Sequence, residues 1–244
     1  MCYSFFDEIT MNLSYRLKHI IDMCPYSETI IDVGCDHGYI SINLINEKKC
    51  KQCYAVDINA KPLNNAIKNI KEYGLENKIR CITSNGFDFL KETKKTSAII
   101  AGMGGATSVK ILKENRTKAN NMDYILIQPN SYAKDARRYV VEENIFIKEE
   151  DVIFCEGLYY EYILIFPKRQ GFFDKHKQKF LLEFGYDIPS CIIENPSGKY
   201  NEYINWRITK YKKVLLELDN NGLTQSERYI DFDNKIKILK GWLK

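Results

Sequence analysis

Ten consecutive residues, 29–38 (Thr-Ile-Ile-Asp-Val-Gly-Cys-Asp-His-Gly), constrain the fold more than any other part of the chain. A β-branched apolar run ends there in a turn that contains Gly34 and Gly38, and an amphipathic segment follows. This pattern predicts a buried strand that leads into a helix, which is where open α/β sheets bind ligands. The two glycines allow the backbone to approach such a ligand closely.

Two carboxylates, Asp32 and Asp36, lie in and beside this turn. A dinucleotide site at this position offers helix-terminal N–H groups to an anionic pyrophosphate. Two carboxylates would repel a pyrophosphate, but they suit a ligand that carries an ammonium and a sulfonium group. S-adenosylmethionine carries both groups, so the turn predicts a methyl-donor site.

Length and composition are consistent with one full core and a smaller appendage, since the chain has 244 residues and is 45% hydrophobic. No apolar run approaches the ~18 residues of a membrane span, and the N-terminus lacks the features of a signal peptide. We therefore expect a cytoplasmic protein with no membrane partner.

The cysteines do not indicate a metal site. Of the eight cysteines, only Cys50 and Cys53 form a CxxC pair, with no second pair and no nearby histidine. Reduced structural thiols are favoured over zinc or redox chemistry, so no metal is expected.

Charge is distributed unevenly along the chain. Residues 168–244 hold 15 Lys and Arg against 10 Asp and Glu, whereas the whole chain has a net charge of +4. A basic C-terminal third is compatible with a nucleic-acid partner, although many ordinary helical surfaces are as basic.

Hydrophobic periodicity predicts an alternation of helices and strands. The expected helices cover 8–24, about 38–47 and about 60–73, and the expected strands cover 29–33, 53–58, 79–83, 97–101, 123–128, 146–154 and 158–166. Pro62 falls in the first turn of its helix and Gly74 ends that helix. The last two strands must form an antiparallel hairpin, because a parallel crossover needs a dozen or more residues.

Five alternating strands closed by a hairpin are typical of the class I, Rossmann-like methyltransferase fold, here with a seven-stranded sheet. Residues 167–171 look like the linker out of it, which divides the chain into a methyltransferase domain (1–167) and a helical domain (168–244). Helices are expected there over 172–184, about 198–220 and 225–242, the last capped by Thr224. Two long helices joined by a tight turn predict an antiparallel hairpin or short coiled coil.

Asp57 ends the second predicted strand, 25 residues after Asp32, with Ile58 next to it. A carboxylate at this spacing binds the ribose hydroxyls of an adenosine-bearing cofactor. The alternative is a helix-capping aspartate before Asn59. Asn85-Gly86 follows the third strand, where an asparagine can bond the adenine amino group, or where the pair forms an ordinary turn.

The segment Gly102-Met103-Gly104-Gly105 follows a buried strand at the carboxyl edge of the sheet. Three glycines in four residues leave little but backbone at the floor of a cleft, although a flexible loop could use glycine in the same way. Met103 either packs against the cofactor adenine or fills the core. Gly104 and Gly105 are then expected to contact the substrate.

Gln128-Pro129-Asn130 ends the fifth strand, next to the glycine segment in a sheet of this order. Amide side chains at the rim of a cleft can read the edge of a planar base, and the alternative is a plain strand-ending turn. Asp36 and His37 form an adjacent acid–base pair in the same cleft, although a lone histidine in a turn is more often structural.

Together these motifs resemble a known family. Ser14-Tyr-Arg-Leu17, the Asp32–His37 turn, Gly102–Gly105 and Gln128–Asn130 are similar to the bacterial tRNA (adenine-22-N1)-methyltransferases, the TrmK family. The resemblance covers most of 12–166 and implies that the substrate is adenine 22 of tRNA. The family pattern tends to have aspartate where this chain has Asn85, whereas Asp57 fits the ribose-binding position.

The implied reaction needs no base, because adenine N1 carries a neutral lone pair at pH 7. The enzyme must present the base, align N1 with the sulfonium methyl group and favour the positive charge that forms on the ring. Asp36 is the first candidate for the last task, with His37 and Asn130 next. Arg16 is expected to hold the cofactor carboxylate or an RNA phosphate.

Two other functions are compatible with the sequence. A methyltransferase of the same fold could act on a small molecule or a protein, with the C-terminal helices as a lid or a dimerisation element. A non-catalytic module could keep the donor site only for stability, although the intact acid and glycine motifs weigh against it. We expect a monomer.

Overall fold

The computed structural model describes residues 13–170, 175–195 and 197–244. Within these ranges, seven strands form one sheet in the order β3-β2-β1-β4-β5-β7-β6. β1 to β5 are mutually parallel, whereas β7 runs antiparallel to both β5 and β6. The strands are β1 (Ser27–Val33), β2 (Cys50–Asp57), β3 (Ile79–Thr83), β4 (Thr96–Gly104), β5 (Ile125–Ser131), β6 (Ile145–Cys155) and β7 (Leu158–Gln170). The predicted fold class is confirmed.

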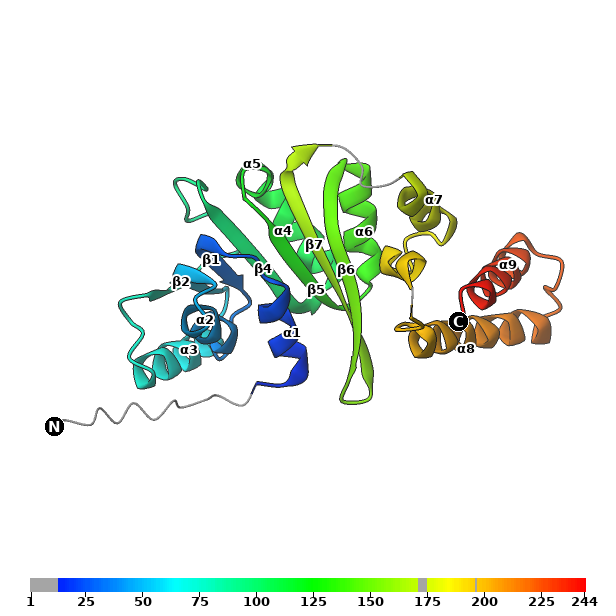
Figure 1. Cartoon of the computed structure of the whole chain (residues 1–244), viewed down its shortest axis with the longest axis horizontal. Helices are drawn as coiled ribbons and strands as arrows, with labels where there is room; N and C mark the ends of the chain where they lie inside the picture. Colours follow the sequence, from blue (N-terminus) through cyan, green and yellow to red (C-terminus); the bar gives the residue numbers. More distant parts are fainter. Residues whose placement is uncertain (1–12, 171–174, 196) are drawn as a thin grey trace.

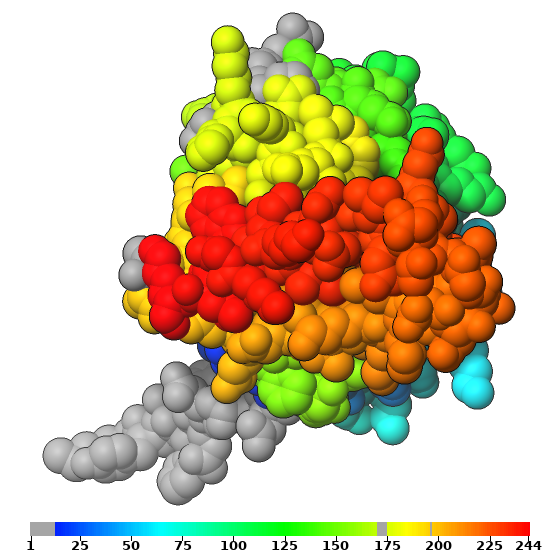
Figure 2. Space-filling view, turned by 90° about the vertical axis from the view of Figure 1, so that its right-hand side faces the viewer, coloured from blue at the N-terminus to red at the C-terminus, as the bar shows by residue number. Residues whose placement is uncertain are grey.

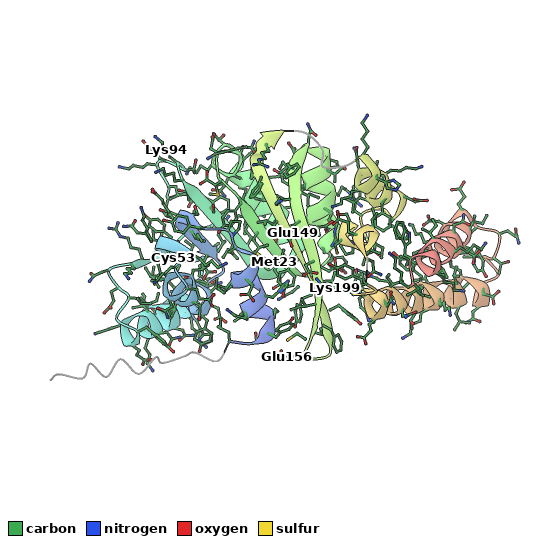
Figure 3. All side chains as sticks on the ribbon, viewed as in Figure 1. Met23, Cys53, Lys94, Glu149, Glu156 and Lys199 are labelled. Carbon is green, nitrogen blue, oxygen red and sulfur yellow. The ribbon has the colours of Figure 1, made fainter. Side chains whose placement is uncertain are left out.

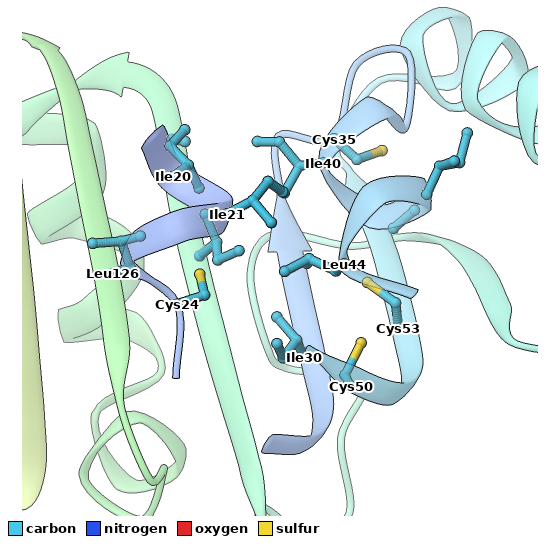
Figure 4. Packing of buried hydrophobic residues seen from close by; sticks show 14 of the residues in the cluster. Ile20, Ile21, Cys24, Ile30, Cys35, Ile40, Leu44, Cys50, Cys53 and Leu126 are labelled. Carbon is cyan, nitrogen blue, oxygen red and sulfur yellow. The ribbon is translucent and has the colours of Figure 1, made fainter. Parts of the chain in front are cut away.

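Helices cover both faces of this sheet (Figure 1). On one face lie α1 (Tyr15–Met23), α2 (Tyr39–Asn46) and α3 (Ala60–Glu72), and on the other α4 (Gly105–Glu114), α5 (Arg116–Asn120) and α6 (Ala133–Glu142). Successive side chains of each strand are therefore buried on opposite faces of the sheet. Leu126 packs on the face covered by α1, whereas Ile125 and Ile127 pack on the face covered by α4, α5 and α6. Figure 4 shows Ile20 and Ile21 of α1 between Leu126 and Ile40.

The strand order places a topological switch beside β1. β1 pairs with β2 on one side and with β4 on the other, so the connections after β1 and β4 diverge at the same sheet edge. Ligands of open α/β sheets bind in the crevice at this point, outside the carboxyl ends of the strands.

Several predicted boundaries need correction. The first helix begins at Tyr15, where the Ser14 hydroxyl accepts a hydrogen bond from the Leu17 N–H, so the prediction of a helix from residue 8 is wrong at residues 13–14 and its earlier part lies outside the described residues. The predicted linker at 167–171 is wrong as far as Gln170, because β7 continues to that residue, which pairs with Ile145 of β6 beyond an irregularity in the ladder. Ser226, not Thr224, caps the last helix. Gly74 ends α3 as predicted, in the left-handed conformation.

The C-terminal part is helical, as predicted. It contains α7 (Lys175–Glu183), a 3₁₀ helix η1 (Ser190–Glu194), α8 (Asn201–Asn220) and α9 (Glu227–Gly241). α8 and α9 pack against each other as an antiparallel hairpin, and Figure 2 shows them across one end of the molecule in orange and red. Their core includes Phe180, Tyr203, Ile204 and Leu239 and reaches Val152 of β6.

Buried ion pairs join this helical part to the sheet. Arg137 of α6, with no exposed side-chain surface, donates to Glu150 of β6 and to Glu161 of β7. Arg207 of α8 donates to Glu161 over 2.6 Å. We call Arg137, Glu150, Glu161 and Arg207 the seam. Beside it, Lys199 (labelled in Figure 3) donates to Asp151 of β6 over 2.7 Å.

Candidate active site

A cavity of about 470 Å³ opens at the carboxyl ends of β1, β2, β4 and β5, and we call it the cleft. Eight of the residues that the sequence predicts for the site line it: Arg16, Gly34, Asp36, His37, Asp57, Gly102, Met103 and Asn130. Six further residues of the cleft lining are not predicted by the sequence patterns: Leu17, Cys35, Tyr39, Ile40, Pro62 and Ala101. The remaining predicted residues lie outside the lining: Asp32, Gly38, Ile58, Asn85, Gly86, Gly104, Gly105, Gln128 and Pro129.

The turn after β1 needs glycine at its first position. Gly34 has a φ of +78°, and a Cβ atom there would lie 2.9 Å from the Cε of Met103. The N–H groups of Gly34 and Cys35 both donate to the carbonyl of Val56, over 2.8 and 3.0 Å. These amides are therefore engaged inside the protein and do not form the cradle of N–H groups that a pyrophosphate requires.

Asp32 lies beneath this turn instead of in the cleft. Its side chain accepts hydrogen bonds from the N–H and the hydroxyl of Ser41, over 3.2 and 2.7 Å, and so ties β1 to the first turn of α2. Its Oδ1 atom is buried with no hydrogen-bond partner among the described residues. Burial raises the pKa of Asp32 to about 6, and no cation in the described part of the chain opposes this shift. A cation bound in the cleft would favour its ionised form.

Asp36 and His37 form the rim of the cleft. Asp36 has a φ of +47°, which is strained for a non-glycine residue, and its side chain is 68% exposed. His37 Nε2 lies 3.7 Å from the Asp36 carboxylate, and the His37 ring stacks on Tyr39 at 5.2 Å between centroids. An aromatic residue directly after Gly38, at the start of a helix, was the signal that could have identified Tyr39 from the sequence.

A chain of hydrogen bonds crosses the cleft floor from α1 to β4. The Arg16 guanidinium donates to Gln128 Oε1 over 2.8 Å, and Gln128 Nε2 donates to Asn130 Oδ1 over 3.3 Å. Asn130 Nδ2 in turn donates to the Gly102 carbonyl over 2.8 Å. Gln128 is fully buried, so it acts by orienting Arg16 and Asn130 and has no surface for a ligand.

Gly104 and Gly105 lie where β4 passes into α4, next to the end of β5. A Cβ atom on Gly105 would come within 2.1 Å of the Tyr132 carbonyl oxygen, so only glycine allows the ends of β4 and β5 to approach this closely. Pro129 faces a neighbouring cavity of about 310 Å³, whose lining includes Asn130, Tyr132, Lys134, Tyr159, Trp206 and Arg207. We call this cavity the side pocket.

The residues predicted around the adenosine half of the cofactor have different surroundings. Asp57 lines the cleft, and its Oδ1 accepts a hydrogen bond from the Asn59 N–H over 2.8 Å, so it also shapes the start of α3. Ile58 is 63% exposed. Asn85 Nδ2 donates to Glu114 over 2.7 Å, next to Gly86, which packs against Ile111.

Other features of the described residues do not point to a competing site. A depression of about 810 Å³ follows the edge strand β3, away from the carboxyl ends of β1 and β4. Cys50 and Cys53 are buried free thiols in β2. No helix in the described ranges combines the length and apolarity that a membrane span requires.

A family model described as a methyltransferase domain matches residues 13–163. A solved structure of M. capricolum TrmK in complex with S-adenosyl-homocysteine is 30% identical, with a TM-score of 0.77, and the match covers 94% of this chain and 97% of that one. A Streptococcus pneumoniae protein solved with S-adenosyl-L-methionine is 25% identical over 95% of this chain and all of that chain, with a TM-score of 0.73.

Among curated sequences, the tRNA (adenine(22)-N(1))-methyltransferase of Bacillus subtilis is 26% identical over 154 residues. This match covers 63% of the present chain and 65% of the relative, which is less than two thirds of its length. The match to the Bacillus subtilis sequence thus leaves more than a third of this chain unaligned, whereas the likeness to the M. capricolum structure covers 94% of it.

Proposed function

The chain belongs to the TrmK family of methyltransferases, and from this premise we propose that it transfers a methyl group from S-adenosylmethionine to N1 of adenine 22 in tRNA. The observation that carries the proposal is the acidic cleft at the switch point. Asp36 and Asp57 line it and Asp32 lies beneath it, while its turn amides are engaged by Val56. Such a site suits a cationic donor better than a dinucleotide.

The cleft residues fit the donor group by group. Asp57 is positioned for the ribose hydroxyls at the end of β2, as in other adenosine sites. Asp32 and Asp36 favour the ammonium and sulfonium charges, and Arg16 on the other wall is available for the carboxylate. When bound, S-adenosylmethionine supplies an activated methyl group on a positively charged sulfur.

The protein's task toward the adenine is positioning and electrostatic stabilisation. Adenine N1 already carries a lone pair at neutral pH, so no side chain has to remove a proton from it. Asn130, fixed by Gln128 and by the Gly102 carbonyl, presents its amide at the rim for the edge of the base. The carboxylate of Asp36 favours the positive charge that the ring gains in the transition state.

The RNA is proposed to reach the cleft along α8. Tyr203 and Tyr211 of α8 are buried and donate to Glu161 and Asp187, so they serve packing. Trp206 is half-buried, Lys210 lies over its ring at 5.4 Å, and Lys213 continues the same face one turn on. Neither lysine has a carboxylate within ion-pair distance among the described residues.

Mass spectrometry of tRNA nucleosides tests the activity. The purified protein is incubated with S-adenosylmethionine and unmodified tRNA, which is then digested to nucleosides. We expect 1-methyladenosine to accumulate in proportion to donor consumed. Donor consumption without methylated tRNA would favour the alternative of a methyltransferase with a small-molecule or protein substrate.

A salt titration tests the RNA surface. Because Glu161 of the seam is paired with both Arg137 and Arg207, deleting residues 168–244 would remove one of the two guanidinium groups on this buried carboxylate, so surface variants are the better test. Lys210→Ala combined with Lys213→Ala should weaken tRNA binding and reduce the slope of log K against log salt by about 2. Lys51→Ala with Lys68→Ala, whose lysines pair with Glu28 and Glu72, is the matched control.

The proposed setting is the cytoplasm, with the protein acting as a monomer. The seven described cysteines are free thiols, as expected for a reducing compartment. Light scattering of the purified chain, with and without tRNA, checks the monomer.

A further inference from the structure

The side pocket adjoins the cleft and is built by the sheet and the C-terminal helices together. Asn130 lines both cavities. Tyr132, between β5 and α6, and Lys134, in the first turn of α6, form one side, and Tyr159 of β7 with Trp206 and Arg207 of α8 forms the other. A volume of about 310 Å³ is at the lower end of the range for ligand pockets, which suits one planar group.

The aromatic wall of the side pocket is held rigidly. The Trp206 ring lies 5.1 Å from the Tyr159 ring and 5.6 Å from the Tyr203 ring. The Arg207 guanidinium lies over Trp206 at 4.8 Å and donates to Glu161 and to the Tyr203 hydroxyl. A wall fixed in this way loses little conformational entropy when a flat ligand stacks on it.

The charges around the side pocket favour an uncharged ring with anionic groups outside it. Inside, Arg207 is already neutralised by Glu161 and faces Asp187, so a phosphate gains little there. At the rim, Lys134 has no carboxylate within ion-pair distance in the described part of the chain, and Lys210 lies over the Trp206 ring. Asp187, whose side chain is 34% exposed, can accept a hydrogen bond from an exocyclic amino group.

We propose that the side pocket binds the base of a nucleotide directly next to the methylated adenine. A neutral base stacks on Trp206, its amino group faces Asp187, and Lys134 and Lys210 contact the flanking phosphates. The inference rests on the proposed function, because Asn130 then separates the target base in the cleft from its neighbour in the side pocket. Holding two adjacent bases would fix the direction of the strand across the cleft.

A double-mutant cycle between protein and RNA tests this subsite. Binding of wild type and Trp206→Ala is measured with three tRNA transcripts: one intact, one abasic on the 5′ side of the target adenine and one abasic on its 3′ side. With intact tRNA, Trp206→Ala should weaken binding by about 5- to 150-fold, the range for loss of one base–aromatic stack. With one of the two abasic transcripts, the same substitution should change binding by less than about 2-fold.

Two protein controls separate stacking from folding. Trp206→Phe should retain most of the binding, since a ring remains, and Tyr26→Ala removes a 57% exposed aromatic residue before β1 without effect. Donor affinity should be equal in all variants. An equal loss with all three transcripts, or no loss with intact tRNA, would overturn the subsite. If wild type produces no 1-methyladenosine in tRNA, the proposed function fails and the subsite fails with it.

Discussion

The turn under the cleft and the seam both bury carboxylates, but in opposite electrostatic settings. Asp32 lies under the turn with Ser41 as its one hydrogen-bond partner among the described residues, and burial raises its pKa to about 6. At Glu161, burial also opposes ionisation, but the guanidinium groups of Arg137 and Arg207 outweigh it and lower the pKa to about 2. Asp32 thus has no counter-ion among the described residues and can gain one from a bound cation. The carboxylate of Glu161 in the seam is already paired with two guanidinium groups.

The two regions also differ in how far apart their partners lie in the chain. Asp32 and Ser41 are nine residues apart, within one strand–turn–helix unit. Glu161 is bonded to Arg137 and Arg207, which are 24 residues before it and 46 after it. The turn under the cleft is therefore held by a local contact, whereas the attachment of the C-terminal helices depends on buried charges that are distant in the chain.

Among the substitutions proposed, removal of Arg137, the cation at the centre of the seam, should have the largest effect on stability. Arg137→Ala leaves Glu150 and Glu161 buried without their shared partner, and we expect a loss of about 3–5 kcal/mol in the free energy of unfolding. Urea denaturation measures it. Arg138→Ala, in which the neighbouring guanidinium is exposed and lies over the Tyr186 ring, is the matched control. A loss no larger for Arg137 than for Arg138 would mean that the seam does not hold the helices.

The stability of the protein measured over a range of pH should distinguish the contribution of Asp32 from that of Glu161. Because the folded-state pKa of Asp32 is raised from 3.8 to about 6, its contribution to stability is full below pH 3.8 and is lost as the pH rises through 6, by up to about 3 kcal/mol. Glu161, with its pKa lowered from 4.5 to about 2, contributes above pH 4.5 and loses that contribution as the pH falls.

Urea denaturation of wild type and Asp32→Asn between pH 4 and pH 6.5 measures this contrast. Without donor, the stability of the variant relative to wild type should increase across this interval. Asp22→Asn, an exposed carboxylate on α1, should show no such trend. A difference between wild type and Asp32→Asn that stays constant with pH would contradict the unsatisfied state of Asp32.

The negative charge of Asp36 at the rim of the cleft should affect the rate of the reaction strongly and the stability of the fold little. Asp36→Asn keeps the shape of the side chain but removes its charge, and we expect turnover to fall by roughly 10²-fold, as when one positioned electrostatic group is lost. The measurement is the single-turnover rate at saturating donor and tRNA. A near-normal rate would assign the role to another group, with His37 and Asn130 as the next candidates.

The hydrogen-bond chain on the cleft floor should give the smallest effect. Gln128→Met keeps the volume but removes the acceptor of Arg16 and the donor to Asn130, so both lose their fixed orientation. We expect a decrease of about 10-fold in kcat/KM for tRNA, equivalent to about 1.4 kcal/mol, with donor affinity nearly unchanged. An equal loss in donor affinity would mean that the role of Gln128 is to orient Arg16 and not Asn130.

The local parts of this structure were predictable from the sequence. Apolar periodicity and short connections identified the strands and the terminal hairpin, and the acid–glycine turn identified one wall of the cleft. The sequence did not show that Asp32 turns away from the cleft toward Ser41, because a strand-ending carboxylate can face either way. It also did not show that β7 continues through 167–170, because Pro167, Lys168 and Arg169 are typical of a loop.

The non-local parts were not predictable in this way. Arg137 and Arg138 are identical neighbours in the sequence, yet Arg137 is fully buried and Arg138 is exposed. Only the arrival of Glu150 and Glu161 from the hairpin distinguishes them. For the same reason the side pocket could not be recognised, since Asn130, Tyr159 and Trp206 meet only after the C-terminal helices dock on the sheet.

The most direct test of the account is site-specific methylation of one tRNA. Two unmodified transcripts, one with adenine and one with guanine at position 22, are incubated with S-adenosylmethionine and the full chain, and their nucleosides are quantified by mass spectrometry. We expect close to one 1-methyladenosine per adenine-22 transcript and none in the guanine-22 transcript. Equal methylation of both transcripts, or methylation of neither, would contradict it.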